Sequence, residues 1–466
     1  MVRDVIDPAV AEAERNPPKL GAGGEVEFHA AHRRAARAVW ASGIVGADAV
    51  EQAALFYLLT QAGEGGHACP VACSAGLVRA LRTGASDELR ERFLPPLLET
   101  DYDRAQRGAQ FLTERHGGSD VGANRVEAIP DGDDSWRLHG EKWFCSVADA
   151  DQFLVTARPR GAPAGTRGIG CFLVPRKAGG FQIRRLKDKL GTRALATGEI
   201  VFAGAEAYAI GPVEEGFRTA VGVLNTSRWL NALGAAGVQR RAYEEASAFA
   251  RERVAFGQPI AEYPLVRENL AVLKAEADGS LASSMELTAV VDRIDRGAAD
   301  EEDLAWHRVL VNANKFVTSL AATRAVRRAI ETLGGNGTIE DFSPLPRLYR
   351  DAIVFESWEG THNVLCAQVL RDLARMDAVE PIVEHAGGSE ELAARLRRSV
   401  GEPAFGALHG RRQVGELVRA LQVKALRETE PASADLLERR HLVAGWNPEA
   451  DPDYPDLIDR VLGPDA

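Results

Sequence analysis

The segment GFRTAVGVLNTSRWLNALGAAGVQRRAYEEASAFARER, residues 216–253, decides the fold class. It contains no proline, and proline breaks the interior of a helix, so we predict one long helix here. Apolar residues at three- and four-residue spacing predict two further long helices, at about 264–296 and 303–333. The preceding runs WRLHG, DQFLVTARP and GIGCFLVPR are short, rich in β-forming residues and separated by turn sequences, which indicates strands.

Residues 27–105 are predicted to be mostly helical. Apolar residues recur every three or four positions in EQAALFYLLTQA (51–62) and ELRERFLPPLLETD (88–101), and GEGGH (63–67) reads as a loop between helices. Helices, then strands, then long helices favour an α+β fold in consecutive blocks over alternating βαβ units. We predict an N-terminal helical domain (1–107), a middle β-domain (108–213), a C-terminal helical domain (214–378) and a helical C-terminal extension (379–466). Within the extension, residues 389–441 look helical and the Pro/Asp-rich end looks loose.

Composition narrows the class of protein. The 466 residues are 45% hydrophobic and 26% charged, which is typical of a globular protein, and the net charge is −11. No apolar run is long enough for a membrane helix, and the N-terminus lacks the apolar core of a secretory signal. An acidic balance argues against nucleic acid as the main partner.

Cysteine usage predicts free thiols and a cytoplasmic protein, because five cysteines are few and odd in number. Cys69 and Cys73 share a predicted helix face, but no second pair or nearby histidine completes a metal site, so we expect no metal.

Two glycine- and aromatic-containing segments could bind a flat ligand. In FLTERHGGSDVGAN (111–124), Gly117 and Gly118 allow close approach, and Thr113 and Ser119 offer hydroxyls. A turn leading into a strand would look the same. In GEKWFCSVADADQFLV (140–155), an aromatic side chain could stack on a ring, or it could belong to the core.

Each of three later segments, taken alone, also allows either a ligand-binding or a purely structural interpretation. In RERVAFGQPI (251–260), Arg253 and Phe256 are expected on one helix face, suited to a phosphate and an adenine, or to a plain helix end. The glycines of ETLGGNGTIED (331–341) could expose amides to a diphosphate, or cap a helix. SWEGTHN (357–363) carries one carboxylate, Glu359, and reads as a loop before the next helix.

The order and spacing of these segments carry more information than any one of them. The chain resembles the acyl-CoA dehydrogenase family of flavoproteins, because five of its segments match segments of that family in the same order. They are TERHGGSD, FCS, RVAFG, GGNG and WEGT. The resemblance covers about residues 27–378. Within the family, the sequence resembles the alkylation-response (AidB-type) branch most closely. The segments that carry this resemblance are EVEFH, GGSDV, KWFxSV, RLKDKLGTR and PRLYRD.

The resemblance implies the family fold, with a four-helix C-terminal domain, and an FAD cofactor. It implies cofactor contacts for Leu112, Thr113, Gly118, Ser119, Phe144, Ser146, Arg253, Phe256, Gly334, Gly335, Thr361 and Asn363. Within this set, Arg253, Phe256, Gly334 and Gly335 would hold the FAD of a neighbouring subunit. A homotetramer or homodimer is therefore expected.

Glu359 matches the family's catalytic base. The resemblance implies that it takes the α-proton of an acyl thioester, expected to be a CoA ester. The β-hydride would pass to flavin N5, giving an α,β-unsaturated product. Ser227 stands at the alternative base position and has no carboxylate; with Arg228 and Trp358 it is expected to face the substrate. Trp358 replaces the family's tyrosine, and Arg115-His116 replaces its Pro-Gly.

Two other functions remain open. One is a DNA-associated alkylation-response flavoprotein. Against it, the extension has 11 basic and 16 acidic residues, and its most basic stretch, 391–440, has 10 basic and 7 acidic, so DNA binding is not expected. The other is a related flavin oxidase, because one fold hosts several chemistries. The sequence leaves the acyl chain and the electron acceptor open.

Overall fold

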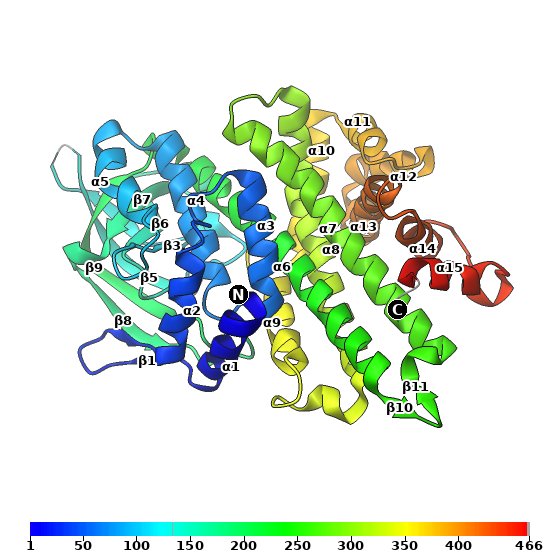
Figure 1. Ribbon diagram of the computed structural model, residues 1–466. Helices are drawn as coiled ribbons and strands as arrows, with labels where there is room; N and C mark the ends of the chain where they lie inside the picture. Colours follow the sequence, from blue (N-terminus) through cyan, green and yellow to red (C-terminus); the bar gives the residue numbers. More distant parts are fainter. Residues whose placement is uncertain (133, 464–466) are drawn as a thin grey trace. The chain divides into compact units, whose positions relative to one another are not determined.

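The computed structural model describes residues 1–132 and 134–463 (Figure 1). By their contacts, the described residues group into two compact units. The first comprises Met1–Leu55 and Glu64–Ser227, and the second comprises Phe56–Gly63 and Arg228–Ala466. The first unit combines helices with a sheet and the second is helical, so the α+β class is confirmed. The domain bounds given above remain a prediction.

Helices form the N-terminal part of the first unit. They are α1 (Asp7–Arg15), α2 (Ala30–Trp40), α3 (Ala49–Leu59), whose last turn is grouped with the second unit, α4 (Ala68–Gly84) and α5 (Asp87–Leu97). Gly108 is the first residue of the main sheet of this unit. Its backbone N–H donates to Ser74 Oγ on α4 at 2.9 Å. An added Cβ at Gly108 would lie 3.0 Å from the Cα of Ser74, so a larger residue would crowd this contact between helix and strand.

Seven strands of the described chain form the main sheet of this unit. They are β3 (Gly108–Phe111), β4 (Glu127–Pro130), β5 (Trp136–Ser146), β6 (Gln152–Pro159), β7 (Gly170–Pro175), β8 (Phe181–Leu186) and β9 (Thr197–Ala209). Strand β7 pairs with both β6 and β9, which closes β6–β4–β5–β9–β7 into a barrel. All six residues of β7 are buried, which explains its unbroken apolar run. The strands predicted in the middle of the chain are confirmed.

Long helices build the second unit. They are α6 (Gly216–Glu252), which begins in the first unit, then α7 (Pro264–Asp295), α8 (Glu301–Leu333), α9 (Leu345–Ser357) and α10 (His362–Met376). The three predicted long helices are confirmed. Their facing surfaces are rich in alanine, and Trp229 and Trp306 are almost fully buried. Short strands β10 (Val254–Ala255) and β11 (Gln258–Pro259) form a hairpin after α6, as β1 (Lys19–Leu20) and β2 (Val26–Glu27) do near the N-terminus.

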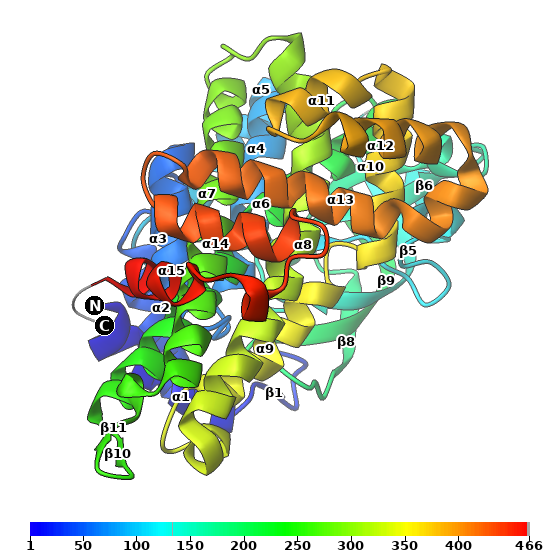
Figure 2. The same ribbon diagram turned by 90° about the vertical axis from the view of Figure 1, so that its right-hand side faces the viewer.

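The extension belongs to the second unit. It comprises α11 (Val379–His385), α12 (Glu390–Gly401), α13 (Pro403–Leu426), α14 (Pro431–His441) and α15 (Tyr454–Leu462). Figure 2 shows α13 and α14 lying across the long helices, and both contact α7. The predicted loose end was wrong. Helix α15 packs on α7, Leu457 is fully buried, and the Tyr454 hydroxyl donates to Glu268 Oε1 at 2.7 Å.

A buried carboxylate ties the extension to α7. Glu276 lies 2.7 Å from Arg419 Nη1 on α13 and 2.7 Å from His441 Nε2 on α14. Burial alone would raise the pKa of Glu276, but these two neighbours outweigh it and hold the pKa well below its usual range. The extension is therefore part of the packed interior of this unit.

All five cysteines are buried, and none of them forms a disulfide in the described chain. Cys69 and Cys73 share a face of α4 as predicted, with their sulfurs 3.7 Å apart. Burial raises the pKa of the Cys171 and Cys366 thiols to about 12. Within residues 1–132 and 134–463, no three His, Cys, Asp or Glu side chains are placed to hold a metal ion. The described helices include none that is both long and apolar enough to cross a bilayer.

Candidate active site

Glu359 lies in the short loop between α9 and α10, as predicted. Its φ is 56°, and Gly360 follows with φ 108°. Glycine tolerates such a backbone, but a non-glycine residue in the left-handed region costs on the order of 1–3 kcal/mol. Conformations of this kind persist only where the surroundings impose them, and they concentrate at functional sites.

Two cations hold this loop by binding carbonyl oxygens in the loop and in the last turn of α9. Lys315 Nζ on α8 donates to the carbonyls of Glu356 and Gly360, both at 3.0 Å. Arg228 Nε on α6 donates to the carbonyl of Glu359 at 2.9 Å. The last carbonyls of a helix have no partner within the helix, and here positive side chains supply it.

The same cations give the loop its electrostatics. Burial lowers the pKa of Lys315 to about 7, although the nearby Glu359 and Glu356 act to raise it. Burial also lowers the pKa of Arg228, against the influence of Glu359 and Asp372. Glu359 itself is half-buried. The site thus sets one carboxylate beside two cations in a region of low solvent access.

His362 and Trp358 complete the surroundings of the loop. His362 Nε2 lies 2.8 Å from Glu356 Oε2, and this bond helps to keep the pKa of Glu356 below its usual value although burial raises it. The ring of Trp358 stacks on Phe355, with centroids 5.0 Å apart, so one face of the indole is used in packing. Thr361 and Asn363, predicted to bind flavin, are exposed at the start of α10.

A second group of predicted residues gathers in the first unit, around the turn 112–119. The N–H of Trp143 donates to the carbonyl of Thr113 at 2.9 Å, which joins the turn to β5. An added Cβ at Gly118 would lie 3.6 Å from the methyl of Thr113. Leu112 is buried, Thr113 is half-buried, and Gly118 and Ser119 are exposed. The turn therefore presents a hydroxyl and open backbone at the surface of this unit.

A buried ion pair, not singled out in the sequence, holds this turn. Lys142 Nζ donates to Glu114 Oε1 and to the carbonyl of Leu112, both at 2.9 Å, and to Thr156 Oγ1 at 3.1 Å. The side chains of Lys142 and Glu114 are 0% and 4% exposed. Glu114 also accepts from the backbone N–H of Val126 at 3.0 Å. The sequence contains an indication of this pair, because Glu114 in TER and Lys142 in EKW are charged residues within β-rich segments. Charged residues in such segments suggest an ion pair.

The two residues of β5 that are predicted to face the flavin, Phe144 and Ser146, lie at a partly exposed surface. Phe144 is 55% exposed, whereas the other Phe, Tyr and Trp residues described in this unit are buried or half-buried. Ser146 Oγ lies 3.3 Å from Thr197 Oγ1, and Lys189 Nζ donates to the same Thr197 oxygen at 3.0 Å. An open ring next to hydroxyl and ammonium groups can hold a planar polar ligand.

Ser227 is already bonded within the first unit. Gln110 Nε2 donates to its hydroxyl oxygen at 2.8 Å, and Ser227 is 4% exposed. The hydroxyl therefore retains its proton to donate.

The residues expected to hold a partner's FAD are exposed on the second unit. The expectation that Arg253 and Phe256 share a helix face was wrong, because α6 ends at Glu252 and Phe256 lies in the β10–β11 turn with φ 54°. Phe256 is 98% exposed. Gly334 and Gly335 are exposed too, and an added Cβ on either would meet no described atom within 4 Å.

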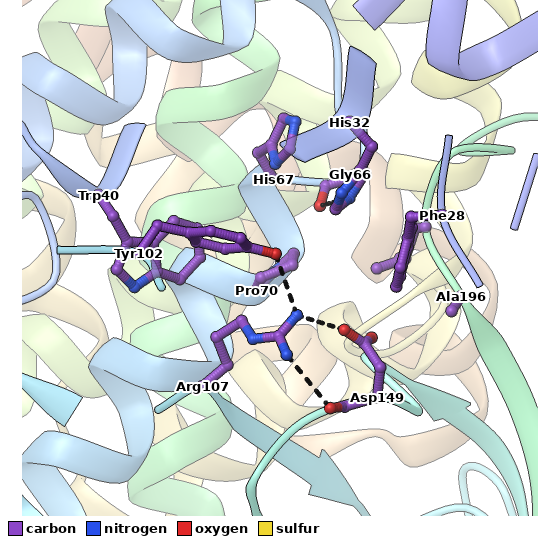
Figure 3. A pocket seen from close by; sticks show the side chains of 11 residues that line it. Phe28, His32, Trp40, Gly66, His67, Pro70, Tyr102, Arg107, Asp149 and Ala196 are labelled. Carbon is purple, nitrogen blue, oxygen red and sulfur yellow. Dashed lines mark hydrogen bonds and ion pairs between the residues drawn. The ribbon is translucent and has the colours of Figure 1, made fainter. Parts of the chain in front are cut away.

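A small cavity in the first unit was not anticipated (Figure 3). It measures about 10 Å³ and is lined by His32, His67, Trp40, Tyr102 and Arg107 among others. Arg107 donates to Tyr102 and to Asp149, as the dashed lines show. Among the described residues, His67 Nε2 and Trp40 Nε1 have no hydrogen-bond partner. The volume suits one water molecule and excludes a substrate.

Burial controls the two histidines of this cavity. It lowers the pKa of His32 to about 4 and that of His67 well below its usual value. Their rings lie 4.5 Å apart. Gly66, the residue before His67, contacts the other histidine, since its carbonyl oxygen lies 3.3 Å from His32 Nε2. The φ of Gly66 is 80°, which glycine adopts easily.

Comparisons with known proteins identify the family. The acyl-CoA dehydrogenase middle domain matches residues 109–205, the acyl-CoA dehydrogenase C-terminal domain matches 214–374, and the N-terminal domain of the adaptive response protein AidB matches 24–104. The putative acyl-CoA dehydrogenase AidB of Escherichia coli is 34% identical over 379 residues, covering 76% of this chain and 67% of that protein. The chain therefore belongs to the acyl-CoA dehydrogenase family, and the predicted resemblance to the AidB branch is confirmed.

Other relatives agree on the fold. Acyl-CoA dehydrogenase family member 11 of Caenorhabditis elegans is 35% identical over 324 residues, 65% of this chain and 51% of that protein, so the match spans about half of its length. The crystal structure of C. elegans ACDH-11 in complex with C11-CoA is 25% identical with a TM-score of 0.83, covering 98% of this chain and 84% of that one. An acyl-CoA dehydrogenase from Bacillus anthracis, complexed with FAD, has a TM-score of 0.74 at 20% identity, covering 99% and 82%; it shows the fold alone.

Proposed function

We propose that this chain is an FAD-dependent acyl-CoA dehydrogenase in which Glu359 removes the α-proton of an acyl thioester. The observation that carries the proposal is the Glu359 loop, where a carboxylate-bearing residue is held at φ 56° by Lys315 and Arg228. Residues with a strained backbone and titratable groups with perturbed surroundings both concentrate at functional sites.

The donor set of the first unit fits a flavin. Thr113 and Ser119 offer hydroxyls, Phe144 offers an open ring face, and Ser146 lies beside Thr197. Leu112, Gly118, Thr361 and Asn363 are proposed to contribute to the same cofactor. When bound, FAD supplies an acceptor for the hydride that leaves the β-carbon, chemistry that no side chain provides.

Glu359 would act as the general base. A carboxylate of ordinary pKa, about 4, is a poor match for the weakly acidic α-proton of a thioester. An acyl chain that displaces water from the carboxylate makes it a stronger base, because desolvation disfavours the charged form. Trp358 and Ser227 are proposed to shape the substrate side, where Ser227 retains a hydroxyl proton to donate.

A CoA ester is the proposed substrate. The C11-CoA bound to C. elegans ACDH-11 supports a substrate of this class, since that protein shares the fold over almost the whole chain. We also propose a homodimer or homotetramer, in which a partner covers the ring of Phe256 and uses Arg253, Gly334 and Gly335 to bind its own FAD. The near-complete exposure of Phe256 leaves its ring available to a partner subunit.

Anaerobic mixing of the yellow protein with a panel of acyl-CoA esters tests the proposal. Reduction bleaches the flavin band, and Glu359→Gln should slow bleaching by about 10²–10⁴-fold, the range of a general base. Glu380→Gln, an exposed acid paired with Arg397 on the extension, is the matched control and should react at the wild-type rate. If no ester bleaches the flavin, or if Glu359→Gln reacts as fast as the control, the proposal fails.

DNA binding by the extension is the second candidate, and the ion pairs argue against it. Arg395 pairs with Glu416, Arg398 with Glu402, and Arg419 with Glu276. Basic groups satisfied by local carboxylates have little charge left for phosphates. A gel-shift titration at low salt, where phosphate-driven binding is strongest, should show no shift; a shift there would favour the DNA-associated function.

A further inference from the structure

Lys315 is a buried ammonium with no obvious place in the reaction. It lies on α8 within an otherwise apolar and small-residue stretch, and its relative exposure is 0%. Removing an ammonium from water is costly unless strong partners replace the water. Its ammonium donates hydrogen bonds to two backbone carbonyls, those of Glu356 and Gly360.

These two carbonyls flank Glu359 on either side. The carbonyl between them, that of Glu359, accepts from Arg228 at 2.9 Å. Three carbonyls, one in the last turn of α9 and two in the loop that follows, therefore converge on two cations from two different helices. These donors oppose relaxation of the left-handed backbone at Glu359.

We propose that Lys315 is a positioning residue, which fixes the direction of the Glu359 carboxylate by holding the carbonyls on both sides of it. This rests on the proposed function, in which Glu359 is the base. A base displaced by about 1 Å can lose two orders of magnitude in rate, so a rigid loop has a direct catalytic value.

The charge of Lys315 has a second effect on the base. The charged and titratable groups that face it are Glu356 and its partner His362, Glu359, and Arg228. A nearby positive charge favours the ionised carboxylate, so its removal should raise the pH at which Glu359 becomes an active base. A residue that only supports folding would leave this pH unchanged.

Exchange of the substrate's α-proton in deuterated solvent tests the inference without following the redox step. The holoenzyme is incubated anaerobically with a saturated acyl-CoA over a range of pH, and deuterium at the α-carbon is measured by mass spectrometry. Lys315→Met should lower the exchange rate at least 10-fold and move its rise to higher pH by at least half a unit. Lys315→Arg, which restores a cation, should recover part of the rate and the wild-type pH of the rise.

Controls separate the possible failures. Lys274→Met removes a half-buried lysine on α7 that pairs with Asp278 and Glu430, and it should leave exchange unchanged. Lys315→Met should keep the wild-type flavin spectrum, and its thermal midpoint should stay within a few degrees of the wild-type value. If Lys315→Met does not fold, the same exchange rate and pH dependence are measured on Lys315→Gln. Wild-type rate and pH dependence in the neutral variants would overturn the role of Lys315. Exchange that persists in Glu359→Gln would instead overturn the assignment of the base.

Discussion

Replacing Lys142 by methionine should destabilise the first unit strongly. The change removes the donor of three bonds, to Glu114, to the carbonyl of Leu112 and to Thr156. Glu114 stays 4% exposed and keeps only backbone donors, among them the N–H of Val126. Breaking a buried ion pair from one side costs about 3–5 kcal/mol, because the remaining charge is left without compensation.

Thermal unfolding measures this cost. For a folding unit of roughly 200 residues, about 1 kcal/mol corresponds to about 2–4 °C in Tm, so a loss near 3 kcal/mol predicts a fall of about 6–12 °C. Arg160→Met breaks an exposed pair with Glu127, whose side chains are 60% and 39% exposed, and should leave Tm almost unchanged because solvent screens such a pair. The double variant Lys142→Met/Glu114→Gln should recover part of the loss. Equal Tm values for Lys142→Met and Arg160→Met would refute the reasoning.

Three further predictions concern other parts of the chain. Because burial holds the pKa of His32 at about 4 while the unfolded chain titrates near 6.5, the unfolded state binds the proton first, and stability should fall by about 3 kcal/mol as the pH drops from 6.5 to 4; denaturant unfolding across this range should show it, and His32→Phe should flatten the slope. Gly360→Ala forces a side chain to φ 108°, with its Cβ 3.2 Å from a methyl of Leu365, and should cost on the order of 1–3 kcal/mol in a thermal scan and slow flavin reduction. Deleting residues 379–466 strips α7 of its cover and leaves Glu276 without Arg419 and His441, so the truncated chain should bind a hydrophobic dye and aggregate in size-exclusion chromatography.

The elements that sequence analysis predicted well are those that local pattern controls. The long helices follow from proline-free runs with helical spacing, and the strands follow from short β-rich runs between turns. The error at the C-terminal end has a local cause. Proline and aspartate there suggested coil, yet Pro455 stands in the first turn, where proline is tolerated, and Leu457, Ile458 and Val461 keep helical spacing. The error at Phe256 came from extending the α6 pattern one turn too far.

The site was less accessible from the sequence. Glu359 was found through ordered segments that resemble a family, since one carboxylate in a loop carries little information by itself. Lys315 was missed because its partners lie 41 and 45 residues away, and only the folded chain brings them together. A lysine inside VLVNANKFVTSL, where nearly every neighbour is apolar or small, was the available signal.

The burial of every native thiol makes this chain a convenient background for site-directed labelling. Alkylating reagents must reach the thiolate, and buried thiols react slowly because the reagent has little access to them. A single cysteine introduced at the exposed Ser119 should therefore take up a maleimide fluorophore selectively, with no native cysteine removed. The emission of that fluorophore would report directly on occupancy of the glycine turn, independently of any turnover.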